Sequence, residues 1–290
     1  MSPRVGEPAL LRLRSGPVRE SKGPRPPVLS PYLHPFLARL QTIFFILLVF
    51  HLSLQPCLAF TGEEIQKFQT LLMSKPIGER IAFWAERFVG VPYDMDPLGE
   101  YVSKATIVAD ERVDCMYLTF RAAELALSHT PEEAIQIGLR KRFHSKGILK
   151  EGKVINYDER FEYGEDMIES GKWGEDITHE VGRMTKIKGS RQRDYVDILP
   201  TAELVNGVGS LKSGDIIFFV TQPEKRKVGE IIGHIGIIKV EERPGNPRAS
   251  EVYLIHASGI KGKSGVVKKV LLKDYLSKMP FIGAKITRFE

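Results

Sequence analysis

The chain has few cysteines, little excess charge outside its first segment, and no Gly-rich phosphate loop. Only 2 of its 290 residues are cysteine, which excludes a disulfide scaffold and a four-cysteine zinc site. The net charge of +6 is concentrated in residues 1–59, where 7 Lys or Arg face 2 Asp or Glu, leaving 35 against 34 in residues 60–290. That balance lacks the basic surface typical of nucleic-acid binding. No Gly-rich loop follows an expected strand, so nothing favours nucleotide chemistry.

Residues 1–59 are expected to be a leader ahead of the folded domain. Residues 1–40 are rich in Arg and Pro and have no sustained hydrophobic period, which indicates disorder. The apolar segment Thr42–Leu54 follows, and small residues around Ala59 offer a candidate cut site. This pattern predicts a secretory signal peptide, because the run is shorter than the roughly 20 residues of a spanning helix. An uncleaved N-terminal membrane anchor is the alternative.

Residues 60–290 are expected to form one domain, with helices first and strands afterwards. Hydrophobic residues make up 42% of the chain and charged residues 27%, as in ordinary globular domains. Capping patterns predict four helices, which begin near Thr61, Pro76, Asp114 and Thr130. Apolar β-rich runs then predict five strands, at 216–220, 231–240, 252–256, 266–272 and 282–288. This order favours the α+β class with an antiparallel sheet of about five strands, whereas residues 145–210 carry no clear pattern.

Cys115 stands where the third helix should begin. The unpaired N–H groups and the dipole of a helix N-terminus favour a thiolate over a thiol. We therefore expect Cys115 to react with iodoacetamide faster than an ordinary thiol near neutral pH. The alternative is an inert core residue, since a lone cysteine is most often a small buried hydrophobe.

Two histidines are expected to face each other across a hairpin. His234 and His256 lie in neighbouring predicted strands, and the intervening Glu242–Pro247 is full of turn formers. A hairpin symmetric about Gly245 places residue 256 opposite residue 234, with Cβ atoms about 5 Å apart on one face. One imidazole can then act as a base while the other orients it.

A zinc site is the other reading of the same three residues. Cys115, His234 and His256 could hold zinc with water in the fourth position. The chain has no C-x-x-C or H-E-x-x-H motif, however, and these residues are not otherwise clustered in sequence. No metal or other cofactor is therefore predicted. His129 and His144 flank the fourth helix and are expected to face solvent.

Five short motifs occur in an order that resembles a known superfamily. Gly90–Tyr93, Asp114–Cys115, Ser213–Phe219, Gly233–Ile237 and Ile255–Ser258 are similar to motifs of the NlpC-type cell-wall cysteine peptidases, which are papain-like murein hydrolases of bacteria. The resemblance covers about residues 75–290.

The middle of the chain resembles one branch of that superfamily. Arg142–Gly147, Tyr157–Tyr163 and Met167-Ile168 are similar to the N-acetylmuramoyl-L-alanine amidase-like branch. This chain has Glu162 where that branch often has His, and Met116-Tyr117 where it usually has small hydroxyl residues. Both departures bear on substrate preference more than on the nucleophile.

The resemblance implies a papain-like fold and a role for each matching residue. Cys115 would be the nucleophile, His234 the general base and His256 the orienting third member. Tyr93 would lie beside the thiolate and position the scissile carbonyl. Arg160 and Tyr163 would bind the muropeptide.

The predicted function is that of an exported, cofactor-free cysteine hydrolase. It would cleave an amide bond in peptidoglycan fragments, with the MurNAc–L-Ala bond favoured, as a periplasmic or secreted bacterial protein. Peptidoglycan or a muropeptide is the expected partner, nucleic acid is not, and the chain is expected to be a monomer. The alternatives are a stem-peptide endopeptidase of the same fold and a wall-binding module with a degenerate site.

Overall fold

The structure, a computed structural model, describes residues 60–243, 246–260 and 263–290. All of them belong to one compact unit, Pro56–Glu290. The predicted disordered segment, signal peptide and alternative anchor, together with Gly245, lie outside the described residues. Among the residues described, no helix is long and apolar enough to cross a membrane.

The four helices predicted ahead of the strands are present among the described residues, and they begin close to where the capping patterns predict. They are α2 (Gly62–Leu72), α3 (Ile77–Arg87), α5 (Cys115–Leu127) and α6 (Pro131–Lys141), with the short α4 (Glu100–Ser103) in the loop between α3 and α5. Thr61 and Glu64 form a complete capping box at α2, and Thr130 accepts the Glu133 N–H at α6. These side chains satisfy N–H groups that the first turn of a helix leaves unpaired.

The sheet is antiparallel and larger than the five strands expected. The five predicted strands are present as β6 (Ile216–Val220), β7 (Ile232–Arg243), β8 (Asn246–Ile260), β9 (Lys263–Leu271) and β10 (Gly283–Arg288). The region without a clear pattern adds β3 (Glu175–Asp176), β4 (Thr185–Lys188) and β5 (Tyr195–Pro200). Together they make an eight-stranded sheet with the order β4-β5-β10-β6-β7-β8-β9, in which β3 pairs with β10.

The prediction of about five strands is therefore wrong in number, for a local reason. β4 contains one apolar residue, Ile187, among polar ones, and β5 is interrupted by Asp197 and ends at Pro200. Short strands of this kind are stabilised by their partners and carry little alternation of their own. The predicted α+β class itself is confirmed, since helices pack on an antiparallel sheet.

The remaining elements of the middle region are short. A separate two-stranded sheet joins β1 (Leu149–Lys150) to β2 (Lys153–Val154). The short helices and 3-10 turns are η1 (Tyr157–Glu159), α7 (Gly164–Glu169), α8 (Thr178–Val181), α9 (Thr201–Gly207), η2 (Val208–Ser210), η3 (Pro223–Lys225) and α10 (Leu272–Leu276).

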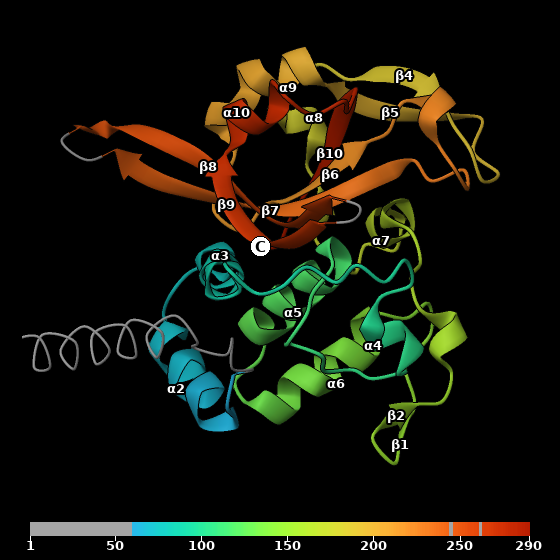
Figure 1. Cartoon of the computed structure of the whole chain (residues 1–290). Helices are drawn as coiled ribbons and strands as arrows, with labels where there is room; N and C mark the ends of the chain where they lie inside the picture. The colour runs from blue at the N-terminus through green and yellow to red at the C-terminus, as the bar shows by residue number, and fades with distance from the viewer. Residues whose placement is uncertain (1–59, 244–245, 261–262) are drawn as a thin grey trace, which may run out of the picture. The chain divides into compact units, whose positions relative to one another are not determined.

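Helices cover both faces of the sheet (Figure 1), and apolar side chains are buried on each face. One core joins Leu118 and Leu125 of α5 to Ile237 and Ile255 of the sheet. A second core, on the opposite face, joins the sheet to α8, α9 and α10 and includes Phe219. Strand side chains alternate between these cores because successive residues of a strand point to opposite faces. α5 is thereby fixed against the sheet by its buried length, and its N-terminus is held over β7.

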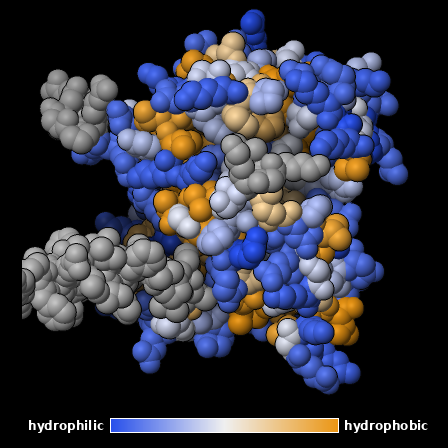
Figure 2. All heavy atoms as spheres, in the orientation of Figure 1, coloured by the Kyte–Doolittle hydropathy of each residue, from blue (hydrophilic) through white to orange (hydrophobic). Residues whose placement is uncertain are grey.

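The outer surface on the side drawn in Figure 2 is mostly hydrophilic, with apolar side chains in small separate patches. Single exposed apolar residues of this kind are normal on soluble proteins.

Candidate active site

Cys115 is the first residue of α5, as the sequence predicts. The Asp114 carboxylate caps the helix by accepting the Tyr117 N–H at 2.6 Å. The thiol is therefore held at the positive end of a well-packed helix, partly exposed to solvent. An N-terminal position of this kind presents backbone N–H groups to an anion.

The thiol is nevertheless held in its neutral form, contrary to the expectation from the helix start. Burial raises the pKa of Cys115 to about 12, and the nearby Asp114 carboxylate acts in the same direction. The N–H groups of Ile235, Cys115 and Met116 favour the thiolate and lower this pKa only in part. Burial therefore has a larger effect on the pKa of Cys115 than the helix N-terminus has, and the depth of burial could not be predicted from the sequence.

The expected reactivity of the free thiol changes accordingly. Iodoacetamide should label Cys115 more slowly than an ordinary thiol at pH 7, with a rate that rises about tenfold per pH unit, because only the thiolate reacts. Mass spectrometry of the alkylated peptide over a range of pH measures this rate. The same chain in urea is the control and should label at the ordinary rate. Fast labelling of the folded chain at pH 7 would contradict the raised pKa.

The two predicted histidines lie on one face and contact each other. His234 Nε2 is 2.9 Å from His256 Nδ1. The predicted contact is confirmed, but the predicted register is wrong by two residues. Ile237 pairs with Ile255, and the register shifts between Glu242 and Arg243. A shift of two keeps every side chain on its original face, so the histidines are diagonal neighbours instead of opposed ones.

Both imidazoles are neutral near pH 7. Burial, reinforced by the neighbouring His256, lowers the pKa of His234 to about 3. Burial and the nearby Lys268 lower the pKa of His256 to about 4. A neutral imidazole can accept a proton from a thiol, whereas a protonated one cannot.

Aromatic rings cover the histidine pair on the sheet face that carries Phe219. The Tyr275 ring lies 4.8 Å from the His256 ring, and the Phe281 ring stacks on His234 at 6.3 Å. Tyr275 is 8% exposed, and none of the described residues gives its hydroxyl a hydrogen-bond partner. Tyr275 is not among the site residues predicted from the sequence. The i, i+3, i+4 spacing of Leu272, Tyr275 and Leu276 was the available signal for its helix.

Replacing Tyr275 with phenylalanine should stabilise the fold by about 1 kcal/mol. The ring contacts stay, while a buried hydroxyl without a partner, which costs about 1–3 kcal/mol, is removed. Urea denaturation measures the change. Tyr195→Phe is the matched control and should have no effect, because Tyr195 is 69% exposed. A loss of stability in the Tyr275 variant would mean that its hydroxyl has a partner.

One cavity of about 670 Å³ brings most of the predicted site residues together. Its lining includes Cys115, His234, Tyr93, Arg160 and Tyr163. His256, the remaining predicted residue, does not line the cavity but contacts His234. The volume is within the usual range of small-molecule sites. No hydrogen bond joins the Cys115 thiol to His234 in the part of the chain that the structure describes.

The three predicted cavity residues differ in how they are held. Tyr93 is partly buried, and its pKa is raised to about 12 by burial and by the proximity of Cys115 and Asp114. Arg160 forms an ion pair with Glu162 at 2.8 Å. Tyr163 comes just before α7, and the guanidinium of Arg191 lies over one face of its ring.

The two histidines of the alternative zinc site each use one ring nitrogen in their mutual contact, His234 Nε2 to His256 Nδ1 at 2.9 Å. Within residues 60–243, 246–260 and 263–290, no group of three or more His, Cys, Asp or Glu is placed to hold a metal ion. As predicted, His129 and His144 are exposed.

Solved structures of bacterial proteins share this fold. An N-acetylmuramoyl-L-alanine amidase from Bacteroides uniformis has a TM-score of 0.54 and 21% sequence identity, covering 73% of this chain and 98% of that one. A Legionella pneumophila protein of the family DUF1460 has a TM-score of 0.56 and 18% identity, covering 78% and 93%. A Bacteroides fragilis protein with a provisional xylanase name has a TM-score of 0.51 and 22% identity, covering 72% and 100%. No family model matches the chain, and no curated protein is similar to it in sequence. At these identities the likeness is one of fold.

Proposed function

We propose that this chain is an exported cysteine hydrolase that cleaves an amide bond in peptidoglycan fragments, namely the MurNAc–L-Ala bond. The observation that carries the proposal is the 2.9 Å contact between His234 and His256 at a cavity that Cys115 also lines. The amidase name of a protein with the same fold supports the choice of bond. The resemblance of residues 75–290 to NlpC-type peptidases supports the cysteine mechanism.

The ring contact supports one nitrogen of His234 as the base. Because Nε2 is engaged with His256 Nδ1, Nδ1 is the nitrogen left to take the thiol proton. His234 then carries its own proton on Nε2 and donates it to His256 Nδ1. His256 orients the base by accepting this bond.

The reaction is acyl transfer through a general base, since the resting thiol is neutral. As Cys115 Sγ bonds to the amide carbonyl, its proton moves to His234 Nδ1 and the carbonyl electron pair moves to oxygen. The C–N bond then breaks, and His234 returns the proton to the leaving amine. Water attacks the acyl-enzyme, gives a proton to His234, and releases the acid and the thiol. The Cys115 N–H at the start of α5 is the proposed oxyanion donor.

Substrate binding is assigned to the cavity wall. Tyr93 is proposed to position the scissile carbonyl beside Cys115. Arg160 and Tyr163 are proposed to bind the muropeptide, as the resemblance implies. A single hydrolase domain over residues 60–290, acting as a monomer in the periplasm or outside the cell, completes the proposal. An uncleaved N-terminal anchor is the alternative to secretion.

Two other functions fit the same cavity. A stem-peptide endopeptidase would use the same three residues on a different amide bond. A wall-binding module with a degenerate site would bind muropeptides without cleaving them, and Met116-Tyr117 after the cysteine favours this alternative.

Digestion of purified muropeptides, followed by mass spectrometry, separates the three. The amidase yields a peptide-free sugar and a peptide with a new L-Ala amino terminus. An endopeptidase leaves a sugar that still carries a short peptide, and a binding module leaves the substrate intact. EDTA should leave the activity unchanged, whereas loss of activity with recovery on adding zinc would overturn the cysteine mechanism.

A further inference from the structure

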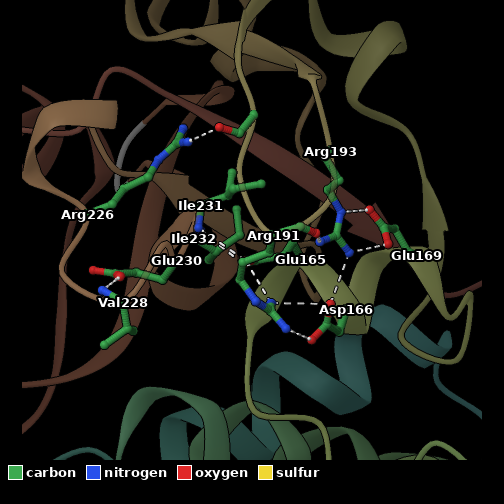
Figure 3. Close-up of polar contacts among 11 residues, drawn as sticks. Glu165, Asp166, Glu169, Arg191, Arg193, Arg226, Val228, Glu230, Ile231 and Ile232 are labelled. Atoms are coloured by element: carbon green, nitrogen blue, oxygen red, sulfur yellow. Dashed lines mark hydrogen bonds and ion pairs between the residues drawn. The ribbon is translucent and has the colours of Figure 1, made fainter.

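A network of charged side chains adjoins the cavity and joins three parts of the chain (Figure 3). Carboxylates come from α7, and two arginines come from the tip of the β4–β5 hairpin, residues 189–194. The third part is the start of β7, the strand that carries His234 two residues further on. The proposed mechanism gives none of these charged groups a role.

Glu165 ties α7 to the start of β7. Its buried carboxylate accepts the Ile231 N–H and the Ile232 N–H, each at 3.2 Å. The preceding Gly164 allows this approach, because a Cβ there would lie 2.7 Å from the Ile232 side chain. Tyr163, which lines the cavity, therefore directly precedes the start of α7, which is hydrogen-bonded to the start of β7 through Glu165.

Arg191 contacts three neighbouring residues at the start of α7. Its guanidinium donates to Glu165 at 3.1 Å and to Asp166 at 3.2 Å. The same guanidinium lies 3.4 Å from the centroid of the Tyr163 ring. A planar guanidinium can stack on a ring and donate along its edge at the same time, which an ammonium cannot do.

The backbone at the hairpin tip is held in an unfavourable conformation. Arg191 and Gln192 have φ angles of 53° and 68°, in the left-handed region that favours glycine. Strain of this kind persists where surrounding contacts fix it, and it is concentrated at functional sites. Arg191 is brought over Tyr163 by this turn.

We propose that Arg191 is a positioning residue that holds the Tyr163 ring in the cavity wall and thereby sets affinity for the substrate. This inference rests on the proposed function, because it assumes that the cavity binds the muropeptide. The hairpin tip, far from α5 in sequence, then acts on substrate binding through Tyr163.

Arg191→Lys tests the proposal, with Arg193→Lys as the matched control. Arg193 pairs with Glu169 and Asp166 in the same network and donates to the Arg191 carbonyl oxygen. None of its described contacts is with Tyr163. We expect Arg191→Lys to raise KM for muropeptides about tenfold with kcat within twofold, because Lys keeps the charge and loses the stack. Arg193→Lys should leave KM unchanged. Equal effects of the two variants would overturn the proposal, since they would report only network stability.

A double-mutant cycle tests whether Arg191 affects KM through the Tyr163 ring. In a Tyr163→Ala background, Arg191→Lys should change KM no further, because the ring through which it acts is absent. An undiminished tenfold effect in that background would overturn the proposed route.

A readout that needs no turnover keeps this inference separate from the proposed function. With ¹³C-labelled tyrosine, the Tyr163 ring signal, assigned with Tyr163→Phe, should shift in Arg191→Lys and stay in place in Arg193→Lys. An unshifted Tyr163 signal in Arg191→Lys would overturn the positioning role. A shift in a chain that cleaves no muropeptide would support that role while the proposed function fails.

Discussion

Cys115→Ser is expected to reduce muropeptide turnover by at least about 10⁴-fold. A serine hydroxyl is much harder to deprotonate than a thiol, and the base opposite it is weak, because burial lowers the pKa of His234 to about 3. The substitution exchanges one atom for a slightly smaller one, so the free energy of unfolding should change little. Steady-state rates on a purified muropeptide, together with a urea denaturation curve, measure both quantities.

The chain supplies its own control for this experiment. Its other cysteine, Cys57, lies in residues 1–59, the predicted leader, and Cys57→Ser should leave the turnover rate unchanged. Turnover of Cys115→Ser at more than about a tenth of the wild-type rate would remove the cysteine as nucleophile. The cavity would then have to work by another reaction or only bind.

The parts of the site that the sequence predicts are those with local signals. Asp114 marks the start of α5 by its capping chemistry, and it does accept the Tyr117 N–H there. The period-two pattern of β7 and β8 predicts that the two histidines share a face of the sheet. This prediction tolerates a register error of two residues, because only an odd shift moves a side chain to the other face. The register itself depends on an irregularity near the end of the hairpin, which turn composition does not specify.

The parts that the sequence does not predict arise from tertiary packing. The raised pKa of Cys115 depends on how deeply α5 is buried against β7. Tyr275 lies on α10, which begins at Leu272, the residue at which the predicted strand was expected to end. This helix places the Tyr275 ring against the histidines. Arg191 reaches Tyr163 through a hairpin whose strands are too short and polar to be recognised. Each case joins residues distant in sequence, and no local pattern encodes such a contact.

His234→Ala is expected to reduce turnover by about 10⁴-fold. His256→Ala is expected to reduce it by about 10² to 10³-fold. The first variant removes the proposed base, whereas the second removes only the group that orients it. The exposed His179 provides the control, because His179→Ala should leave the rate unchanged. Equal losses from His234→Ala and His256→Ala would contradict this division of roles.

The pH profile separates a positioning role of His256 from a merely structural one. The base must be neutral, so kcat/KM falls as the pH drops through the pKa of His234. In the wild type this pKa is about 3, from burial and from His256 beside it, so kcat/KM should stay level from pH 7 to below pH 5. Burial, the larger cause, remains in the variant, so without the neighbouring imidazole the pKa of His234 rises only in part. His256→Ala should therefore lose activity at a higher pH than the wild type. An unmoved acid limb in a folded His256→Ala variant would mean that the two rings do not interact during the reaction.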